Sequence, residues 1–199
     1  MSPSLAPLGA GTVHVVVDMQ RLFAEDTSWR VPTLPDIVEP ILKLIEHRLG
    51  RTLYTRFITP PSLPLAQGAF QSFYRHWPQM TQDRLPPGIF DLIAPLAKRT
   101  SPASLIDKEG FSAFSGPSFQ AALRNLGADA LVLSGVETDV CVLATALEAA
   151  DHRLRVVIAA DAVASYSLAG HRAALDHIYK RYQPMIEVAA YAEIIAAWQ

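Results

Sequence analysis

Residues 130–142 decide the fold, with the sequence Ala130-Leu-Val-Leu-Ser-Gly-Val-Glu-Thr-Asp-Val-Cys-Val142. Residues 130–136 are almost all apolar and show no polar alternation, which is typical of a strand in a sheet covered on both faces. The polar turn that follows leads into residues 139–150, which have helical periodicity. A buried strand followed at once by a helix indicates one βα unit of an α/β protein.

The same alternation runs through the rest of the chain. Further apolar and β-branched runs predict strands at residues 12–17, 51–57, 103–107, 155–160 and 185–188. Helical periodicity predicts helices at residues 35–49, 118–126, 169–181 and 191–198. Alternating strands and helices imply right-handed crossovers. We therefore expect a mostly parallel sheet of about six strands and treat residues 1–199 as a single domain.

The connection at residues 58–102 does not follow this alternation of strands and helices. It contains several prolines and a cluster of aromatic residues. Phe70, Phe73, Tyr74 and Trp77 fall at i, i+3, i+4 and i+7, which predicts a short helix from about residue 68 to the residue before Pro78. Their aromatic face is expected to lie in the core, between subunits or at a pocket mouth. Because an exposed aromatic patch favours aggregation, we expect a homo-oligomer.

Composition limits the possible partners. The chain has 199 residues, of which 50% are hydrophobic and 18% charged, and its net charge is −2. It lacks the basic field with which proteins displace counterions from nucleic acid, so we expect no nucleic-acid partner. A single cysteine cannot form an intramolecular disulfide. Residues 1–11 hold no Lys or Arg, and Val13–Val17 is too short for a signal or membrane segment, so we expect a cytoplasmic protein without a membrane partner.

Three reactive side chains lie at or just beyond the carboxyl ends of predicted strands, namely Asp18, Lys108 and Cys141. In a parallel sheet these ends share one edge, where ligands bind. A carboxylate, an ammonium group and a thiol at one edge are suited to nucleophilic catalysis. Each also has a structural interpretation: a buried small hydrophobe for Cys141, a turn cap for Asp18, and a solvated pair of Lys108 with Asp107.

The position of Cys141 bears on its reactivity. With Thr138 or Asp139 as N-cap, Cys141 would lie in the first helical turn, where the helix dipole favours a thiolate. Glu137 and Asp139 are negative neighbours that oppose this effect. A nearby cation is therefore required, and Lys108 is the expected source.

Three sequence blocks resemble the motifs of the isochorismatase-like cysteine hydrolases, in the same order and across nearly the whole chain. The third block is the most specific of the three. The blocks are Val17-Asp18-Met19-Gln20 with Phe23, Lys108 with Phe111-Ser112-Ala113-Phe114, and Gly135-Val136-Glu137-Thr138-Asp139-Val140-Cys141-Val142.

The resemblance implies a three-layer, Rossmann-like α/β fold with strand order 3-2-1-4-5-6 and a catalytic triad of Asp18, Lys108 and Cys141. It also implies a cis peptide bond between Val136 and Glu137, and an oxyanion hole formed by the N–H groups of Glu137 and Cys141. Members of this family commonly form dimers or tetramers, so a homodimer or homotetramer is expected.

Two differences between this sequence and particular members of the family restrict the predicted function. Nicotinamidase-like members carry an Asp and His metal pair after the second strand, where this chain has Thr55-Arg56-Phe57-Ile58. The histidines show no joint spacing, so we predict no metal and no cofactor. Some isochorismatases that hydrolyse vinyl ethers lack the cysteine, whereas Cys141 is present here and indicates covalent catalysis at an acyl or carbamoyl carbon.

The sequence therefore predicts a cysteine-dependent hydrolase that cleaves a C–N bond of a small amide or carbamoyl (ureido) substrate through a thioester. Phe23, Trp77 and Phe111 are candidates for the pocket wall. The alternatives are a nicotinamidase-like or isochorismatase-like hydrolase of another small substrate, or a non-catalytic flavodoxin-like binding module. The glycines do not form a phosphate-binding loop, and a thiol redox protein would need a C-x-x-C motif.

Overall fold

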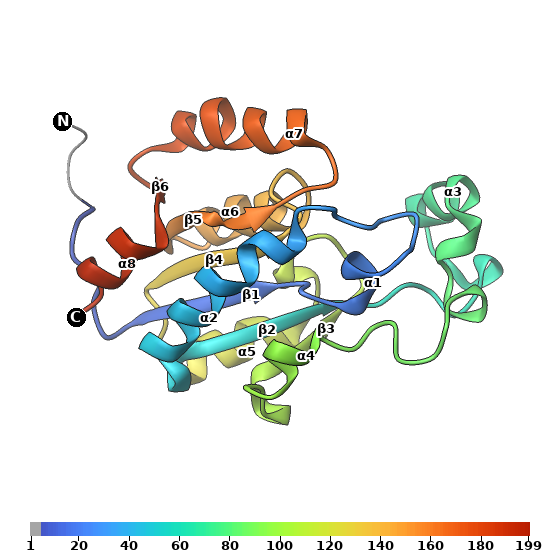
Figure 1. Ribbon diagram of the computed structural model, residues 1–199, viewed down its shortest axis with the longest axis horizontal. Coiled ribbons are helices and arrows are strands. Elements are labelled where there is room, and N and C mark those ends of the chain that lie inside the picture. Colours follow the sequence, from blue (N-terminus) through green and yellow to red (C-terminus); the bar gives the residue numbers. More distant parts are fainter. Residues whose placement is uncertain (1–4) are drawn as a thin grey trace.

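A parallel sheet forms the centre of the computed structural model, which describes residues 5–199 (Figure 1). Its order is β3-β2-β1-β4-β5-β6, as the resemblance implied. Every neighbouring pair is parallel. The strands are β1 (Thr12–Val17), β2 (Thr52–Phe57), β3 (Leu105–Lys108), β4 (Ala130–Val136), β5 (Arg155–Ala164) and β6 (Ile186–Ala189).

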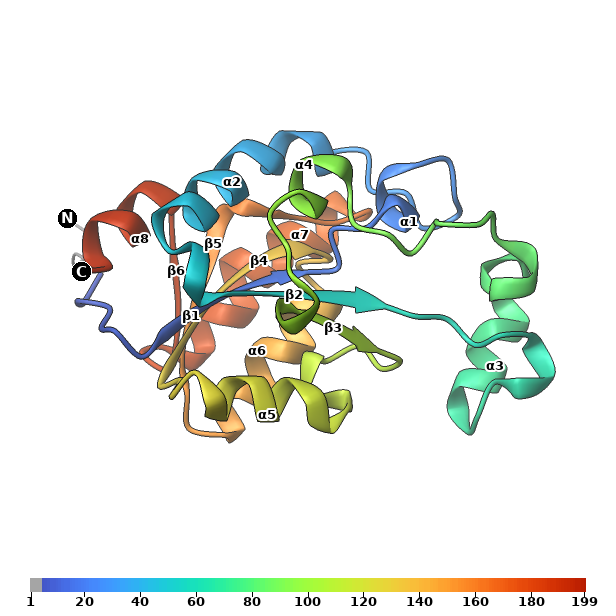
Figure 2. The ribbon, with the colours of Figure 1, turned by 90° about the horizontal axis from the view of Figure 1, so that it is seen from below.

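Helices cover both faces of the sheet and make three layers (Figure 2). One face carries α2 (Val38–His47), α4 (Ala94–Ala97) and α8 (Tyr191–Ala197). The other carries α5 (Pro117–Asn125), α6 (Cys141–Asp151) and α7 (Leu168–Ala173). Two short helices, α1 (Arg21–Ala24) and α3 (Ala69–His76), lie beyond the strand ends. None of the helices in residues 5–199 combines the length and apolar composition needed to cross a membrane.

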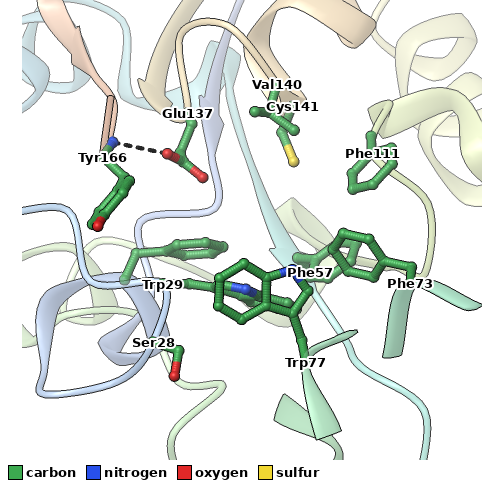
Figure 3. A pocket seen from close by; sticks show the side chains of 11 residues that line it. Ser28, Trp29, Phe57, Phe73, Trp77, Phe111, Glu137, Val140, Cys141 and Tyr166 are labelled. Atoms are coloured by element: carbon green, nitrogen blue, oxygen red, sulfur yellow. Dashed lines mark hydrogen bonds between the residues drawn. The ribbon is translucent and has the colours of Figure 1, made fainter. Parts of the chain in front are cut away.

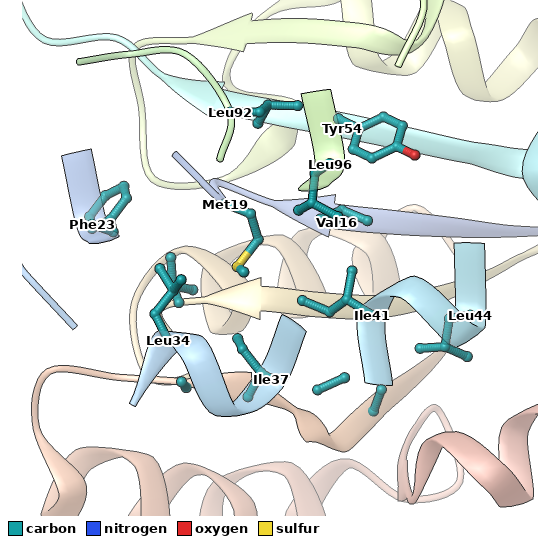
Figure 4. Close-up of a cluster of buried hydrophobic side chains, with 14 of the residues drawn as sticks. Val16, Met19, Phe23, Leu34, Ile37, Ile41, Leu44, Tyr54, Leu92 and Leu96 are labelled. Carbon is teal, nitrogen blue, oxygen red and sulfur yellow. The ribbon is translucent and has the colours of Figure 1, made fainter. Parts of the chain in front are cut away.

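Each strand supplies both hydrophobic layers, because successive side chains point to opposite faces. In β1, Val16 packs in the layer under α2 (Figure 4). Val13, Val15 and Val17 pack in the layer under α5 and α6. All residues of β1 and β4 are buried, which explains why these strands read as continuous apolar runs in the sequence.

The segment predicted as a helix at residues 169–181 is helical throughout, but it is not one α-helix. The α-helix α7 passes into a π-helical turn at Ala174–Ile178 and then a 3-10 turn at Tyr179–Tyr182. The strand predicted at residues 155–160 continues to Ala164, with a register shift between Leu133 and Gly135 where it pairs with β4. This extension carries β5 to the edge of the sheet where the predicted reactive residues lie.

The aromatic segment forms α3, as its periodicity predicted. Tyr74 is 1% exposed, whereas Phe70, Phe73 and Trp77 are half-buried and pack against the core. The helix projects beyond the carboxyl ends of β1 and β2 (Figure 1). Its aromatic face is therefore directed to the chain's own core and to the strand edge, and homo-oligomer formation stays a prediction.

A close approach of two strands precedes the predicted reactive residues. Gly135 pairs with Val17 and has a φ of 102°, a conformation that residues with a Cβ rarely adopt. A Cβ at Gly135 would collide with the Val17 carbonyl oxygen. Glycine at this position thus lets β1 and β4 pair up to their ends.

We predict that Gly135→Ala lowers the free energy of unfolding by at least about 2 kcal/mol, because it adds both backbone strain and a backbone clash. Urea denaturation monitored by circular dichroism measures this change. Gly9→Ala is the control, since no atom lies within 4 Å of its added Cβ. A loss at Gly135 below about 0.5 kcal/mol, a size typical of surface substitutions, would contradict the prediction.

Candidate active site

Asp18 directly follows β1 and is fully buried with a φ of 50°. Aspartate tolerates this left-handed conformation better than most residues. The Thr55 hydroxyl on the neighbouring strand β2 donates to Asp18 Oδ1 at 2.7 Å and accepts from the Asp18 N–H at 3.2 Å. Thr55 thus fixes the carboxylate. Thr55 belongs to none of the motifs in the sequence, although its place near the end of the adjacent strand is a usable signal.

Lys108 lies at the end of β3 and is 3% exposed. Its Nζ lies 2.8 Å from Asp18 Oδ2 and 3.5 Å from Cys141 Sγ. The ammonium group also donates to the carbonyl oxygens of Gly110 at 3.0 Å and Phe111 at 2.9 Å. These contacts hold the three predicted residues Asp18, Lys108 and Cys141 together in the site.

Lys108 must reach past a strand to meet Asp18. Strand β2 lies between β3 and β1, so Lys108 and Asp18 belong to strands about 10 Å apart. The Lys108 side chain crosses this gap with its Nζ 4.8 Å from the centre of the Phe57 ring. The Phe57 ring stabilises the Lys108 ammonium group at this position. The loop after β3 turns back and supplies the two carbonyl acceptors.

Cys141 is the first residue of α6 and is 5% exposed. Its N-cap is Val140, so the expectation that Thr138 or Asp139 caps the helix is wrong. The helix starts later because the turn at residues 137–140 is held by its own bonds, in which the N–H groups of Val140 and Val142 both donate to the Glu137 carbonyl at 3.1 Å. Cys141 nevertheless occupies the first helical turn.

The site places the buried Cys141 thiol next to the Asp18–Lys108 ion pair. Burial raises the pKa of Cys141 well above the usual range of a thiol, while the charge of Lys108 lowers it and that of Asp18 raises it. For Lys108, burial alone would lower the pKa, but Asp18 and Cys141 together raise it. Lys108 therefore provides the expected positive charge, but burial raises the pKa of the Cys141 thiol by more than Lys108 lowers it. Deprotonation of Cys141 requires a base, and the Asp18 carboxylate belongs to the same buried group.

The turn between β4 and α6 presents two backbone donors. The Val136–Glu137 peptide bond is cis. Within residues 5–199, neither the Glu137 N–H nor the Cys141 N–H donates to another group. The intervening Thr138 is held by His171, whose Nδ1 lies 2.8 Å from the Thr138 hydroxyl, and by the Tyr179 hydroxyl, which donates to the Thr138 carbonyl at 2.6 Å. Neither supporting residue belongs to a motif in the sequence.

Cys141 opens into a pocket of about 240 Å³ with aromatic walls (Figure 3). The predicted residues Phe23, Trp77 and Phe111 all line it. The remaining lining residues are Ser28, Trp29, Phe57, Phe73, Glu137, Val140, Cys141 and Tyr166. Phe73 belonged to the predicted aromatic stripe, but Trp29 lies in an irregular loop and gave no periodic signal.

The described residues 5–199 contain no cluster of three or more His, Cys, Asp or Glu side chains that could hold a metal ion. Phe57 lies where the nicotinamidase-like members would carry ligands, and its ring stacks on Phe111 with the planes 4° apart. His14 is buried in β1 and lies 2.8 Å from the Ser134 hydroxyl, and burial lowers its pKa to about 3. It lies within the strand predicted at residues 12–17.

Residues 12–190 match the model of the isochorismatase domain. The chain belongs to the isochorismatase family. It is 42% identical over 72 residues to the uncharacterized isochorismatase family protein PncA of Bacillus subtilis, a match that covers 36% of this chain and 39% of that protein. The chain thus spans about two fifths of the length of this curated relative.

Solved structures of family members are similar over most of their length. A cysteine hydrolase from Pseudomonas syringae pv. phaseolicola 1448A superposes with a TM-score of 0.82 at 25% identity, covering 99% of this chain and 98% of that one. The N-carbamoylsarcosine amidase of Thermoplasma acidophilum gives a TM-score of 0.70 at 25% identity, covering 90% of this chain and 96% of that one. Both comparisons agree with the sheet order and layers described above.

We predict that iodoacetamide alkylates native Cys141 slowly at neutral pH and about tenfold faster for each pH unit above it, because only the thiolate reacts and its pKa is raised. Mass spectrometry gives the rate without ambiguity, since Cys141 is the only cysteine. The same chain in urea is the control and should reach its plateau near the ordinary thiol pKa of about 8.5. A plateau already present at neutral pH in the native protein would contradict the prediction.

Proposed function

We propose that this protein is a cysteine hydrolase that cleaves the C–N bond of a small amide or carbamoyl substrate through a thioester. One observation carries the proposal: Lys108 contacts both Asp18 and Cys141, and Cys141 lines an aromatic pocket. A nucleophile, a base and a charge partner are the groups that acyl transfer requires.

The first half-reaction forms the thioester. Asp18 takes the proton of the Cys141 thiol while the sulfur attacks the substrate carbonyl carbon and forms the C–S bond. The carbonyl oxygen becomes an oxyanion, which the N–H groups of Glu137 and Cys141 stabilise. The C–N bond then breaks, and Asp18 returns its proton to the departing nitrogen, which leaves as ammonia or an amine.

The second half-reaction releases the acid. Water attacks the thioester carbon and gives a proton to Asp18, and the same backbone N–H groups stabilise the second oxyanion. The C–S bond breaks, the carboxylic acid departs, and Asp18 reprotonates the sulfur. Lys108 stabilises the negative charge when it lies on the Asp18 carboxylate or on the Cys141 sulfur, and between these stages the charge lies on the oxyanion.

The comparisons support amide hydrolysis over vinyl-ether hydrolysis and over a non-catalytic module. The similar structures include a protein named cysteine hydrolase and one named N-carbamoylsarcosine amidase. Hydrolysis of a vinyl ether needs only acid catalysis and gives no role to a sulfur at the pocket base. Membership of the isochorismatase family also disfavours a non-catalytic flavodoxin-like module.

We predict that Cys141→Ala abolishes ammonia release from any amide or ureido acid that the wild-type protein hydrolyses, because no other described group can replace the sulfur nucleophile. An ammonia-release screen on the wild type identifies the substrate, and the variant is then assayed on it. Circular dichroism checks that the variant is folded. Activity above about a thousandth of the wild type would refute a covalent role for Cys141.

We predict that Asp18→Asn and Lys108→Ala each lower kcat by at least about a hundredfold, the usual value of proton transfer or of charge stabilisation. Asp107→Asn is the matched control, because Asp107 lies beside Lys108 on β3 but is exposed and paired with Arg56. The control should keep its activity. If either site variant stays within tenfold of the wild type, the proposed role of that residue is wrong.

A further inference from the structure

Among the described residues, the pocket lining contains an acidic side chain but no basic one. The lining consists of six aromatic rings of Phe and Trp, together with Ser28, Glu137, Val140, Cys141 and Tyr166. No Arg, Lys or His side chain belongs to it within residues 5–199, and Glu137 is its only carboxylate. An anionic substrate would therefore enter an aromatic pocket with no cation to replace its lost hydration, which is a large free-energy cost.

Lys108 and Arg56, two cations on strands that end near the pocket, are already engaged. Lys108 is buried against Asp18 and donates to two carbonyl groups. Arg56 donates to both carboxylate oxygens of Asp107, at 2.7 and 2.9 Å, and lies outside the pocket lining. Neither side chain is free to bind a carboxylate of the substrate.

Glu137 directs a carboxyl group to the pocket from the same side as Cys141 (Figure 3). Its Oε2 accepts from the Tyr166 N–H at 2.8 Å, and no other hydrogen bond or ion pair reaches this carboxyl group within residues 5–199. Burial raises the pKa of Glu137, the Tyr166 N–H lowers it, and the negative charge of Asp139 raises it further. A positive charge in the pocket would favour the ionised carboxylate.

The aromatic rings favour the same kind of ligand. Trp29 is central, with its ring 6.0 Å from that of Phe57, 5.8 Å from that of Phe73 and 6.3 Å from that of Trp77. The faces of such rings attract cations, and groups of them bind alkylammonium ligands. The volume of about 240 Å³ restricts the pocket to a small molecule.

We infer that the substrate is a small amide carrying an ammonium group, and that Glu137 and the Trp-rich wall bind this group while the amide carbon faces Cys141. The inference rests on the proposed amide hydrolysis for its orientation at the sulfur. The preference of the pocket for a positively charged ligand does not depend on hydrolysis, so it can be measured by binding alone.

The test compares three amides of similar size and different charge. Trimethylammonioacetamide is cationic. In tert-butylacetamide, carbon replaces the charged nitrogen, so the compound is uncharged, and malonamate is anionic. Homologues with longer methylene chains cover other distances between the two groups. Dissociation constants are measured on Cys141→Ala by calorimetry, and kcat/KM on the wild type. We expect an ammonium amide to bind at least about tenfold more tightly than its uncharged partner, and the anion to bind more weakly than both.

Glu137→Gln should remove most of this tenfold preference, which corresponds to about 1.4 kcal/mol, because it weakens the binding of the ammonium amide more than that of the uncharged amide. Asp26→Asn is the control, since it removes an exposed carboxylate from the segment that leads to Ser28 without touching the lining. Trp77→Leu is a second variant that should also reduce the preference if Glu137→Gln does not fold.

Equal or tighter binding of the uncharged amides would overturn the inference, as would failure of every ammonium amide to bind or an equal effect of Glu137→Gln on all three classes. Preferential binding without hydrolysis by the wild type would support the ammonium preference and count against the proposed amide hydrolysis. The two proposals therefore fail in distinguishable ways.

Discussion

The buried ion pair between Asp18 and Lys108 is the interaction on which the site depends. Charges taken out of water lose hydration that a single partner seldom restores in full. Here Thr55 donates to the Asp18 carboxylate, and two loop carbonyls accept from the Lys108 ammonium group. The pair also joins β3 to β1 across β2, so the outer strand and its loop are positioned by the same contact that places a cation beside Cys141.

The secondary structure could be predicted where burial determines the residue types. Strands β1 and β4 have the predicted ends, because they are covered on both faces and contain little besides apolar residues. The segment at residues 169–181 was predicted as one helix, but its final turns are π and 3-10 structure fixed by tertiary packing. The strand order came from the family resemblance, since alternation of strands and helices does not specify it.

The candidate site was predictable to the extent that it lies at strand ends. Asp18 and Lys108 end or follow strands, and parallel pairing brings such ends to one edge. Cys141 follows β4 in the same way. The pKa direction of Cys141 was not predictable, because it depends on how completely the thiol is desolvated. Trp29 and the support of Thr138 by His171 and Tyr179 depend on tertiary contacts with no local sequence pattern.

The pocket wall and the reactive groups come from different parts of the chain, and this separation bears on how substrate range can diversify. Asp18, Lys108 and Cys141 are placed by the sheet, whereas Trp29, Phe73 and Trp77 belong to excursions beyond it. The excursions can change in length and composition without disturbing the chemistry. Phe57 is an exception, since its ring supports the Lys108 ammonium group and also lines the pocket. A substitution of Phe57 would therefore change the pocket wall and the surroundings of the Lys108 ammonium group together.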